Sequence, residues 1–227
     1  AVVCKGQVLS ETEHNPVETF AGDEDRWYCI PAWIGESLAY IYFHRNYMAS
    51  GIALGNLFKL ADEDSIRGRK PDIIQLFGTP GAGSDKDDGG HYYYDEDNDI
   101  YVGQIPYNDK TTYFGYMKKM MLTLHNLNMI HQGKLPIHGA MVIINFKNGK
   151  SKSVVFMGDS GAGKSESIEA LQEVAGDEIE SIETIFDDMG SFGFTKNEDD
   201  LYAQGTETGA FVRLDDLSSE VAFSNMD

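Results

Sequence analysis

The segment Gly158-Asp159-Ser160-Gly161-Ala162-Gly163-Lys164-Ser165 decides how this chain is organised. Two glycines separated by four residues precede a lysine and a hydroxyl residue, the pattern of a phosphate-binding loop (P-loop). Glycines let backbone N–H groups turn inward around phosphate oxygens, and the helix that follows adds partial positive charge. We expect Lys164 to neutralise the outer phosphates of a nucleotide and Ser165 to hold Mg²⁺, with Glu166 completing the nucleotide-binding segment.

Strand, loop and helix follow one another around this segment. Ile137 to Phe146 alternates as a strand, Asn148-Gly149 is a hairpin signal, and Ser153 to Met157 forms a second strand that runs into the loop. A helix is expected to begin near Lys164 and to bury Ile168, Leu171 and Val174. A chance glycine turn is the alternative interpretation, and this ordered context argues against it.

A further helix is expected before the hairpin. Thr111 or Thr112 can cap it, and Gly133 can end it. Its apolar residues, three or four apart on one face, are Phe114, Met117, Met121 and Leu124. Consecutive helical residues are turned by about 100°, so at most one of Lys118 and Lys119 faces a given site and the other is solvated.

Composition divides the remaining sequence. Residues 27–60 are rich in large apolar side chains, which favours buried strands and a helix, whereas residues 62–99 are rich in Gly, Asp, Lys and Pro and are expected to form long loops. We predict a mixed α/β fold with α+β mixed sheets: a smaller α/β region over residues 1–110, then a P-loop domain over residues 111–227. The chain opens without methionine and stops without an evident closing element, so we expect a piece of a longer protein, truncated at its C-terminal end.

Charge and cysteine content limit the function. Eighteen basic against 37 acidic residues give a net charge of -19, which disfavours nucleic acid and anionic membranes as partners. Any anion site must therefore gather local cations and backbone N–H groups. Cys4 and Cys29 lack the spacing of a zinc site or a redox dithiol, and no apolar run has the roughly 18 residues of a membrane span. We expect a cytoplasmic protein.

A metal-side element follows the loop. Mg²⁺ that bridges phosphate oxygens needs a carboxylate, which the P-loop does not supply in the right place. Ile185-Phe186-Asp187-Asp188-Met189-Gly190 is an apolar run that ends in two aspartates, where a neighbouring strand would bring them to the phosphates. A pair of solvated turn aspartates is the alternative.

Several segments together resemble the phosphoenolpyruvate carboxykinases, especially the ATP-using type, and their smaller relative HPr kinase/phosphorylase. The resemblance spans residues 111–218. Tyr113 to Lys119 looks like the family segment whose second lysine binds the transition metal, so Lys119 inherits that role. His138, in Leu135-Pro-Ile-His-Gly139, matches the metal-binding histidine. Asp188 looks like the metal-binding aspartate, and Asp187 like its partner near the nucleotide-bound Mg²⁺.

The stretch from Glu207 to Arg213 is similar to one that ends in a phosphate-contacting lysine, replaced here by arginine. The resemblance implies ATP or GTP, Mg²⁺ and Mn²⁺ as cofactors, a small anionic substrate, and conversion of oxaloacetate and ATP to phosphoenolpyruvate, ADP and CO₂. The catalytic residues that it implies are Lys119, Lys164, Asp187, Asp188 and Arg213. The metal-binding residues are Lys119, His138, Ser165, Asp187 and Asp188.

Two other functions fit the sequence. In an HPr-kinase-like enzyme, Asp187 or Asp188 would serve as general base towards a protein or small-molecule hydroxyl. A nucleotide-binding module without turnover is the third possibility. The module is motivated by the expected truncation and by the stretch Gly83-Ser-Asp-Lys-Asp87, the nearest counterpart of the carboxykinase segment with the substrate arginine, which contains no arginine.

Overall fold

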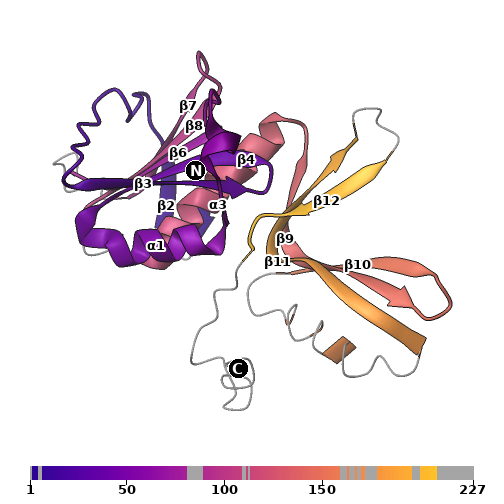
Figure 1. Cartoon of the computed structure of the whole chain (residues 1–227). Helices are drawn as coiled ribbons and strands as arrows, with labels where there is room; N and C mark the ends of the chain where they lie inside the picture. The colour runs from indigo at the N-terminus through magenta and orange to yellow at the C-terminus, as the bar shows by residue number, and fades with distance from the viewer. Residues whose placement is uncertain are drawn as a thin grey trace.

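The chain folds into two β-sheets joined by one long helix, as shown in Figure 1. This computed structural model describes residues 2–4, 7–80, 89–108, 111, 113–158, 163, 167, 170–171, 178–195 and 200–208. The first sheet has eight strands of mixed direction and the second has four antiparallel strands. The predicted mixed α/β class is therefore confirmed.

The first sheet is built around three parallel strands. Its order is β1-β2-β7-β8-β6-β4-β3-β5, in which β4, β6 and β8 run parallel to one another and β3 and β7 flank them antiparallel. The bounds are β1 Val2–Cys4, β2 Gln7–Glu11, β3 Trp27–Ile34, β4 Ser37–His44, β5 Lys59–Leu60, β6 Ile73–Thr79, β7 His91–Asp95 and β8 Ile100–Pro106. Ligands of open α/β sheets bind beyond the carboxyl ends of such parallel strands.

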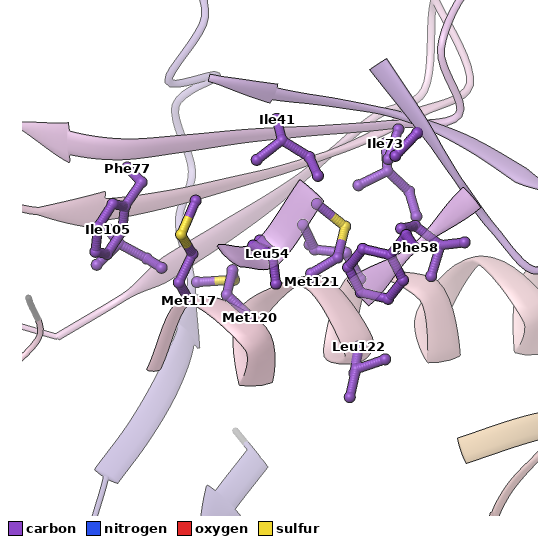
Figure 2. Packing of buried hydrophobic residues seen from close by; sticks show 14 of the residues in the cluster. Ile41, Leu54, Phe58, Ile73, Phe77, Ile105, Met117, Met120, Met121 and Leu122 are labelled. Atoms are coloured by element: carbon purple, nitrogen blue, oxygen red, sulfur yellow. The ribbon is translucent and has the colours of Figure 1, made fainter. Parts of the chain in front are cut away.

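Two helices cover one face of this sheet. Helix α1 (Met48–Leu57) and helix α3 (Phe114–His131) lie side by side in Figure 1, while the short η1 (Arg45–Tyr47) and α2 (Glu63–Ile66) lie in connections. Figure 2 shows Met117, Met120 and Met121 of α3 in the buried cluster, with Met117 towards Phe77 and Ile105 and Met121 towards Phe58. Flexible methionines fill irregular gaps between a twisted sheet and a helix.

The loops expected over residues 62–99 are in part strands, so that prediction is wrong for β6 and β7. Strand β6 is Ile-Ile-Gln-Leu-Phe-Gly-Thr, and it lies in the middle of the sheet with Ile73 and Phe77 fully buried. The strand has only seven residues, and the sequence on either side is rich in Gly and Asp. The composition averaged over residues 62–99 therefore did not reveal a buried central strand. Residues Glu96–Asp99 do form the expected exposed acidic turn, between β7 and β8.

Helix α3 begins and ends close to its predicted limits. Its N-cap is Tyr113, which makes no side-chain capping bond. The predicted cap Thr111 does not serve, because its hydroxyl donates to the Pro106 carbonyl at 2.9 Å, and the alternative cap Thr112 lies outside the described residues. At the other end Gly133 has a φ of +73°, the left-handed conformation that glycine adopts after a helix. Met117, Met121 and Leu124 are fully buried, as their spacing predicted.

The second sheet contains the predicted hairpin. Its order is β10-β9-β11-β12, with bounds β9 Leu135–Phe146, β10 Ser151–Met157, β11 Ile179–Phe194 and β12 Leu201–Gly205. The turn between β9 and β10 holds Gly149 at a φ of +78°, and the Asn148 side chain accepts a bond from the Lys150 N–H. Both strand predictions and the Asn-Gly turn are confirmed.

The joining helix belongs to the core of the first sheet. Residues of α3 share one buried cluster with strands β3, β4, β6 and β8, although the sequence assigned residues 111–227 to the second region. From His131 the chain turns through Gly133 into β9. Among the described residues, no helix combines the length and the apolar character that crossing a membrane requires.

Candidate functional site

Strand register brings the start of the glycine-rich segment and the aspartate pair to the same part of the second sheet. Met157 of β10 is opposite Gly139 of β9, and Gly139 is opposite Asp188 of β11. Neighbouring strands lie about 4.8 Å apart, so the Cα atoms of Met157 and Asp188 are separated by roughly 10 Å. Gly158 follows Met157 directly, so the first glycine of the predicted P-loop lies beside this row of paired residues.

Gly139 allows the three paired residues Met157, Gly139 and Asp188 to lie close together across the strands. A Cβ atom at this position would lie 2.6 Å from the backbone oxygen of Phe156 in β10, closer than real Cβ contacts. Only a residue without a side chain fits between the outer strand and β11. The glycine thus lets β10, which leads into the predicted P-loop, lie against β9 at this point.

Asp188 has a strained backbone. Its φ of +124° lies in a region that residues with a side chain rarely adopt, and the strand has a register shift between Thr184 and Phe186 just before it. Such a conformation costs on the order of 1–3 kcal/mol and clusters at functional sites. Asp187 is opposite Ala140, on the face that carries Val142 and Ile144.

The Asp188 carboxylate has two partners from other elements. Its Oδ2 accepts a bond from Nζ of Lys118 at 2.9 Å, and its Oδ1 lies 3.2 Å from Nε2 of His138. Lys118 Nζ also lies 3.0 Å from Oε1 of Glu207, whose side chain is 8% exposed. A lysine, an imidazole and two carboxylates therefore meet between α3, β9, β11 and the chain after β12.

Acidic groups dominate the charge of this cluster. Burial raises the pKa of Glu207, and although Lys118 opposes this, the nearby Asp188 and Asp187 raise it further. Burial alone would lower the pKa of Lys118, but Glu207 and Asp188 together raise it, so the lysine is held as an ammonium ion. Excess negative charge at a convergent site attracts cations.

Helical phase explains why Lys118 reaches the aspartate. Leu122 and His125, four and seven residues after Lys118, are both buried, so α3 has a second covered stripe besides the one on the first sheet. Four and seven residues after Lys119 stand Thr123 and Asn126, which are only half-buried. The resemblance predicted that Lys119, not Lys118, lies in the metal site. Lys119 is half-buried and has an interaction of its own.

Sequence reasoning missed Lys118 and Glu207 as site residues. The stripe of Leu122 and His125 was a usable signal for Lys118, since it continues the lysine's face of the helix. Glu207 begins the stretch that resembles a phosphate-contacting segment, but no local pattern predicted its burial, which depends on where the chain goes after β12. There the N–H of Thr208 donates to the Leu57 carbonyl of α1 at 2.9 Å, which fixes this segment against the first sheet.

The donors fit a divalent cation in part. Imidazole nitrogen and carboxylate oxygen suit Mn²⁺, and His138 and Asp188 bring one of each to the same place. Within the described ranges, however, no group of three or more His, Cys, Asp or Glu side chains has an arrangement that would hold a metal ion. The two residues are therefore a partial ligand set.

Much of the predicted loop lies outside the described residues. The predicted site residues in that position are Asp159, Ser160, Gly161, Ala162, Lys164, Ser165, Glu166 and Arg213. Gly163, at a φ of +82°, accepts a bond from the N–H of Ser167 at 2.9 Å, the spacing of a helical turn. Leu171 packs against Ala140, Val142 and Ile144, as expected for a helix that folds back on the strand pair.

No protein-family model matches the chain, and no curated protein matches it.

Proposed function

We propose that this chain binds a nucleoside triphosphate at Gly158–Ser165 and takes part in metal-dependent phosphoryl transfer of the carboxykinase type. Lys164 and Arg213 would hold the nucleotide phosphates, and Ser165 and Asp187 would place Mg²⁺. Lys119, His138 and Asp188 would form the second cation site. Positioning and charge neutralisation supply most of the catalysis of phosphoryl transfer.

One observation carries the proposal: a lysine, His138 and Asp188 converge beside the strand that leads into the glycine-rich segment. These residues come from three separate elements, and Lys118 and Asp188 are 70 positions apart in sequence. Separate solvated side chains would have no reason to meet, whereas a phosphoryl-transfer site needs them together. The strained φ of Asp188 adds to this, because strain persists where surrounding contacts impose it.

In the proposed site, each group of the chain has a distinct task. Glu207 and Asp188 hold the Lys118 ammonium in place, where it can attract an anionic oxygen of the substrate. His138 and Asp188 present donors to a divalent cation, which when bound would neutralise charge that develops on the substrate. Asp187 is on the same face of the sheet as Leu171, the side on which the segment after the glycine-rich sequence packs.

The test is turnover with a matched control. The chain is incubated with ATP, Mg²⁺ and Mn²⁺, with and without oxaloacetate, while phosphoenolpyruvate and ADP are followed. We expect both products, and their loss in Lys164→Ala but not in Lys152→Ala, an exposed lysine of β10. ATP binding without either product would support the nucleotide-binding module instead, and absence of ATP binding would contradict every nucleotide hypothesis.

A hydroxyl kinase is the second candidate, favoured by the absence of arginine from Gly83–Asp87. Mn²⁺ binding, followed by electron paramagnetic resonance, separates the two. In a carboxykinase-type site, His138→Ala and Lys119→Ala would abolish Mn²⁺ binding in addition to turnover. In a hydroxyl kinase, Asp187→Asn or Asp188→Asn would stop ADP formation with an added hydroxyl substrate, while the lysine and histidine variants would remain active.

A further inference from the structure

A cavity with a volume of about 390 Å³ lies beside the first sheet, apart from the proposed nucleotide site. Its lining includes Phe20, Arg26, Trp27, His44, Thr79 and Gln104. His44 and Thr79 end the parallel strands β4 and β6, and Gln104 lies near the end of β8, so the cavity is at the carboxyl edge of these strands. Small-molecule sites of open α/β sheets occur at this edge and have volumes of this order.

The cavity and the Asp188 cluster are on opposite faces of the first sheet. Ala39, Ile41 and Phe43 of β4 pack into the core under α1 and α3, so His44, which alternates with them, points to the other side. Trp27 is in register with His44 and shares its face. Figure 1 shows the segment that precedes β3 on the side of the sheet away from α1. The proposed nucleotide site therefore does not account for this cavity.

A glycine bulge shapes the floor of the cavity. Gly78 has a φ of +93°, and the β6–β8 register shifts between Phe77 and Thr79. A Cβ at Gly78 would lie 2.6 Å from the Tyr47 ring, so a side chain is excluded here. The bulge turns Thr79 so that its hydroxyl accepts a bond from the Gln104 amide at 3.0 Å. Bulges near sites re-aim side chains in this way.

Hydrogen-bond donors and aromatic rings make up the recognition surface. The N–H of Asn46 donates to Nδ1 of His44 at 3.3 Å, so the second ring nitrogen, Nε2, carries a proton and is a donor. Arg26 uses Nε and Nη2 on Asp23, at 2.6 and 2.5 Å, and this leaves Nη1 free of that carboxylate. The Phe20 and Trp27 rings pack edge to face with centroids 4.8 Å apart.

No carboxylate lines the cavity among the described residues, although the chain carries 37 acidic side chains. An arginine and a histidine donor beside aromatic walls suit an anion that has an apolar body. We propose that this cavity binds a small carboxylate with a planar apolar body, the carboxylate bonded to Arg26 and His44 and the body packed on Trp27 and Phe20. This inference stands apart from the proposed phosphoryl transfer.

Trp27 provides the readout. The chain has two tryptophans, and Trp33→Phe leaves Trp27 as the only one. In that background, benzoate is titrated and the Trp27 emission is followed, with the indole N–H resonance as a second measurement. We expect saturable binding with a Kd of roughly 1 mM, the range of a fragment-sized ligand. Benzamide, the neutral isostere, and acetate, which lacks the ring, should each bind at least about tenfold more weakly.

Two arginine variants make the test specific. Arg26→Gln should weaken benzoate about tenfold, and Arg26→Lys should restore part of the affinity because the charge returns. Arg67→Gln is the matched control, since Arg67 is another exposed arginine paired with nearby acidic residues. The proposal is overturned if benzoate does not saturate, if benzamide binds equally well, or if Arg67→Gln has the same effect as Arg26→Gln.

Discussion

Lys118 Nζ lies 2.9 Å from Asp188 Oδ2, so helix α3 of the first sheet is tied to strand β11 of the second by a half-buried ion pair. Glu207 completes the link from the other side of the ammonium group. Because three elements meet at one lysine, its removal should affect stability and function together, and the contributions can be separated with paired variants.

Lys118→Met should lower the free energy of unfolding by about 2–3 kcal/mol, since it leaves the Glu207 carboxylate buried without its cation. The double variant Lys118→Met/Glu207→Gln should recover at least half of that loss. Urea denaturation measures both, and Lys150→Met, an exposed lysine in the β9–β10 turn, is the control. Equal losses in the single and double variants would contradict the pairing.

Asp188→Gly should separate strain from function. Glycine adopts a φ of +124° readily, so relief of strain should offset the lost ion pair and leave stability within about 1 kcal/mol of the parent. Asp187→Gly removes a carboxylate from the preceding position of the same strand and should destabilise by roughly 1 kcal/mol, the usual cost of glycine inside a strand. Denaturation midpoints compare them, and a larger loss for Asp188→Gly would show that its backbone is not strained.

Gly139→Ala should disturb the row of paired residues that links β10 to Asp188. The added Cβ would meet the Phe156 carbonyl at 2.6 Å, and because backbone cannot move aside cheaply, we expect a loss of about 2–3 kcal/mol. Gly149→Ala is the matched control, because its Cβ meets nothing within 4 Å and only its φ of +78° resists substitution. That control should lose only about 1 kcal/mol. Comparable losses would rule out a steric role for Gly139.

His125 should make stability depend on pH. Burial lowers its pKa to about 4, helped by the Lys134 charge and opposed by its bond to Asn126 and the Glu36 charge. The unfolded chain binds the proton more readily, so stability is full above the unfolded pKa of about 6.5 and falls as the pH drops towards 4. Between pH 7 and pH 5 the loss attributable to His125 is roughly 2 kcal/mol.

Urea titrations at the two pH values measure that loss. His125→Gln should remove the difference attributable to this residue, whereas His14→Gln, at an exposed position, should leave it unchanged. The same pH dependence in the His125 variant and the parent would contradict a buried neutral imidazole.

The sequence by itself determined the parts of the fold that depend on local pattern. Alternation over residues 137–146, the Asn148-Gly149 turn and the apolar spacing of α3 predicted β9, the hairpin and the helix, because each signal lies within a few residues of its effect. The apolar run before Asp187 and Asp188 was also recognisable as a strand, although β11 continues beyond the two aspartates to Phe194, where pairing with β12 extends it. Strand β6 was not recognisable, because it has only seven residues and polar sequence flanks it on both sides.

Only the tertiary structure decided which groups meet. The choice of Lys118 as the partner of Asp188 depends on how α3 is rotated between two sheets, and the burial of Glu207 on the path of the chain after β12. The strained φ of Asp188 and the cavity beside Arg26 likewise arise from strand pairings between distant segments. Contacts across tens of residues follow from packing of the whole core, and local periodicity carries no record of them.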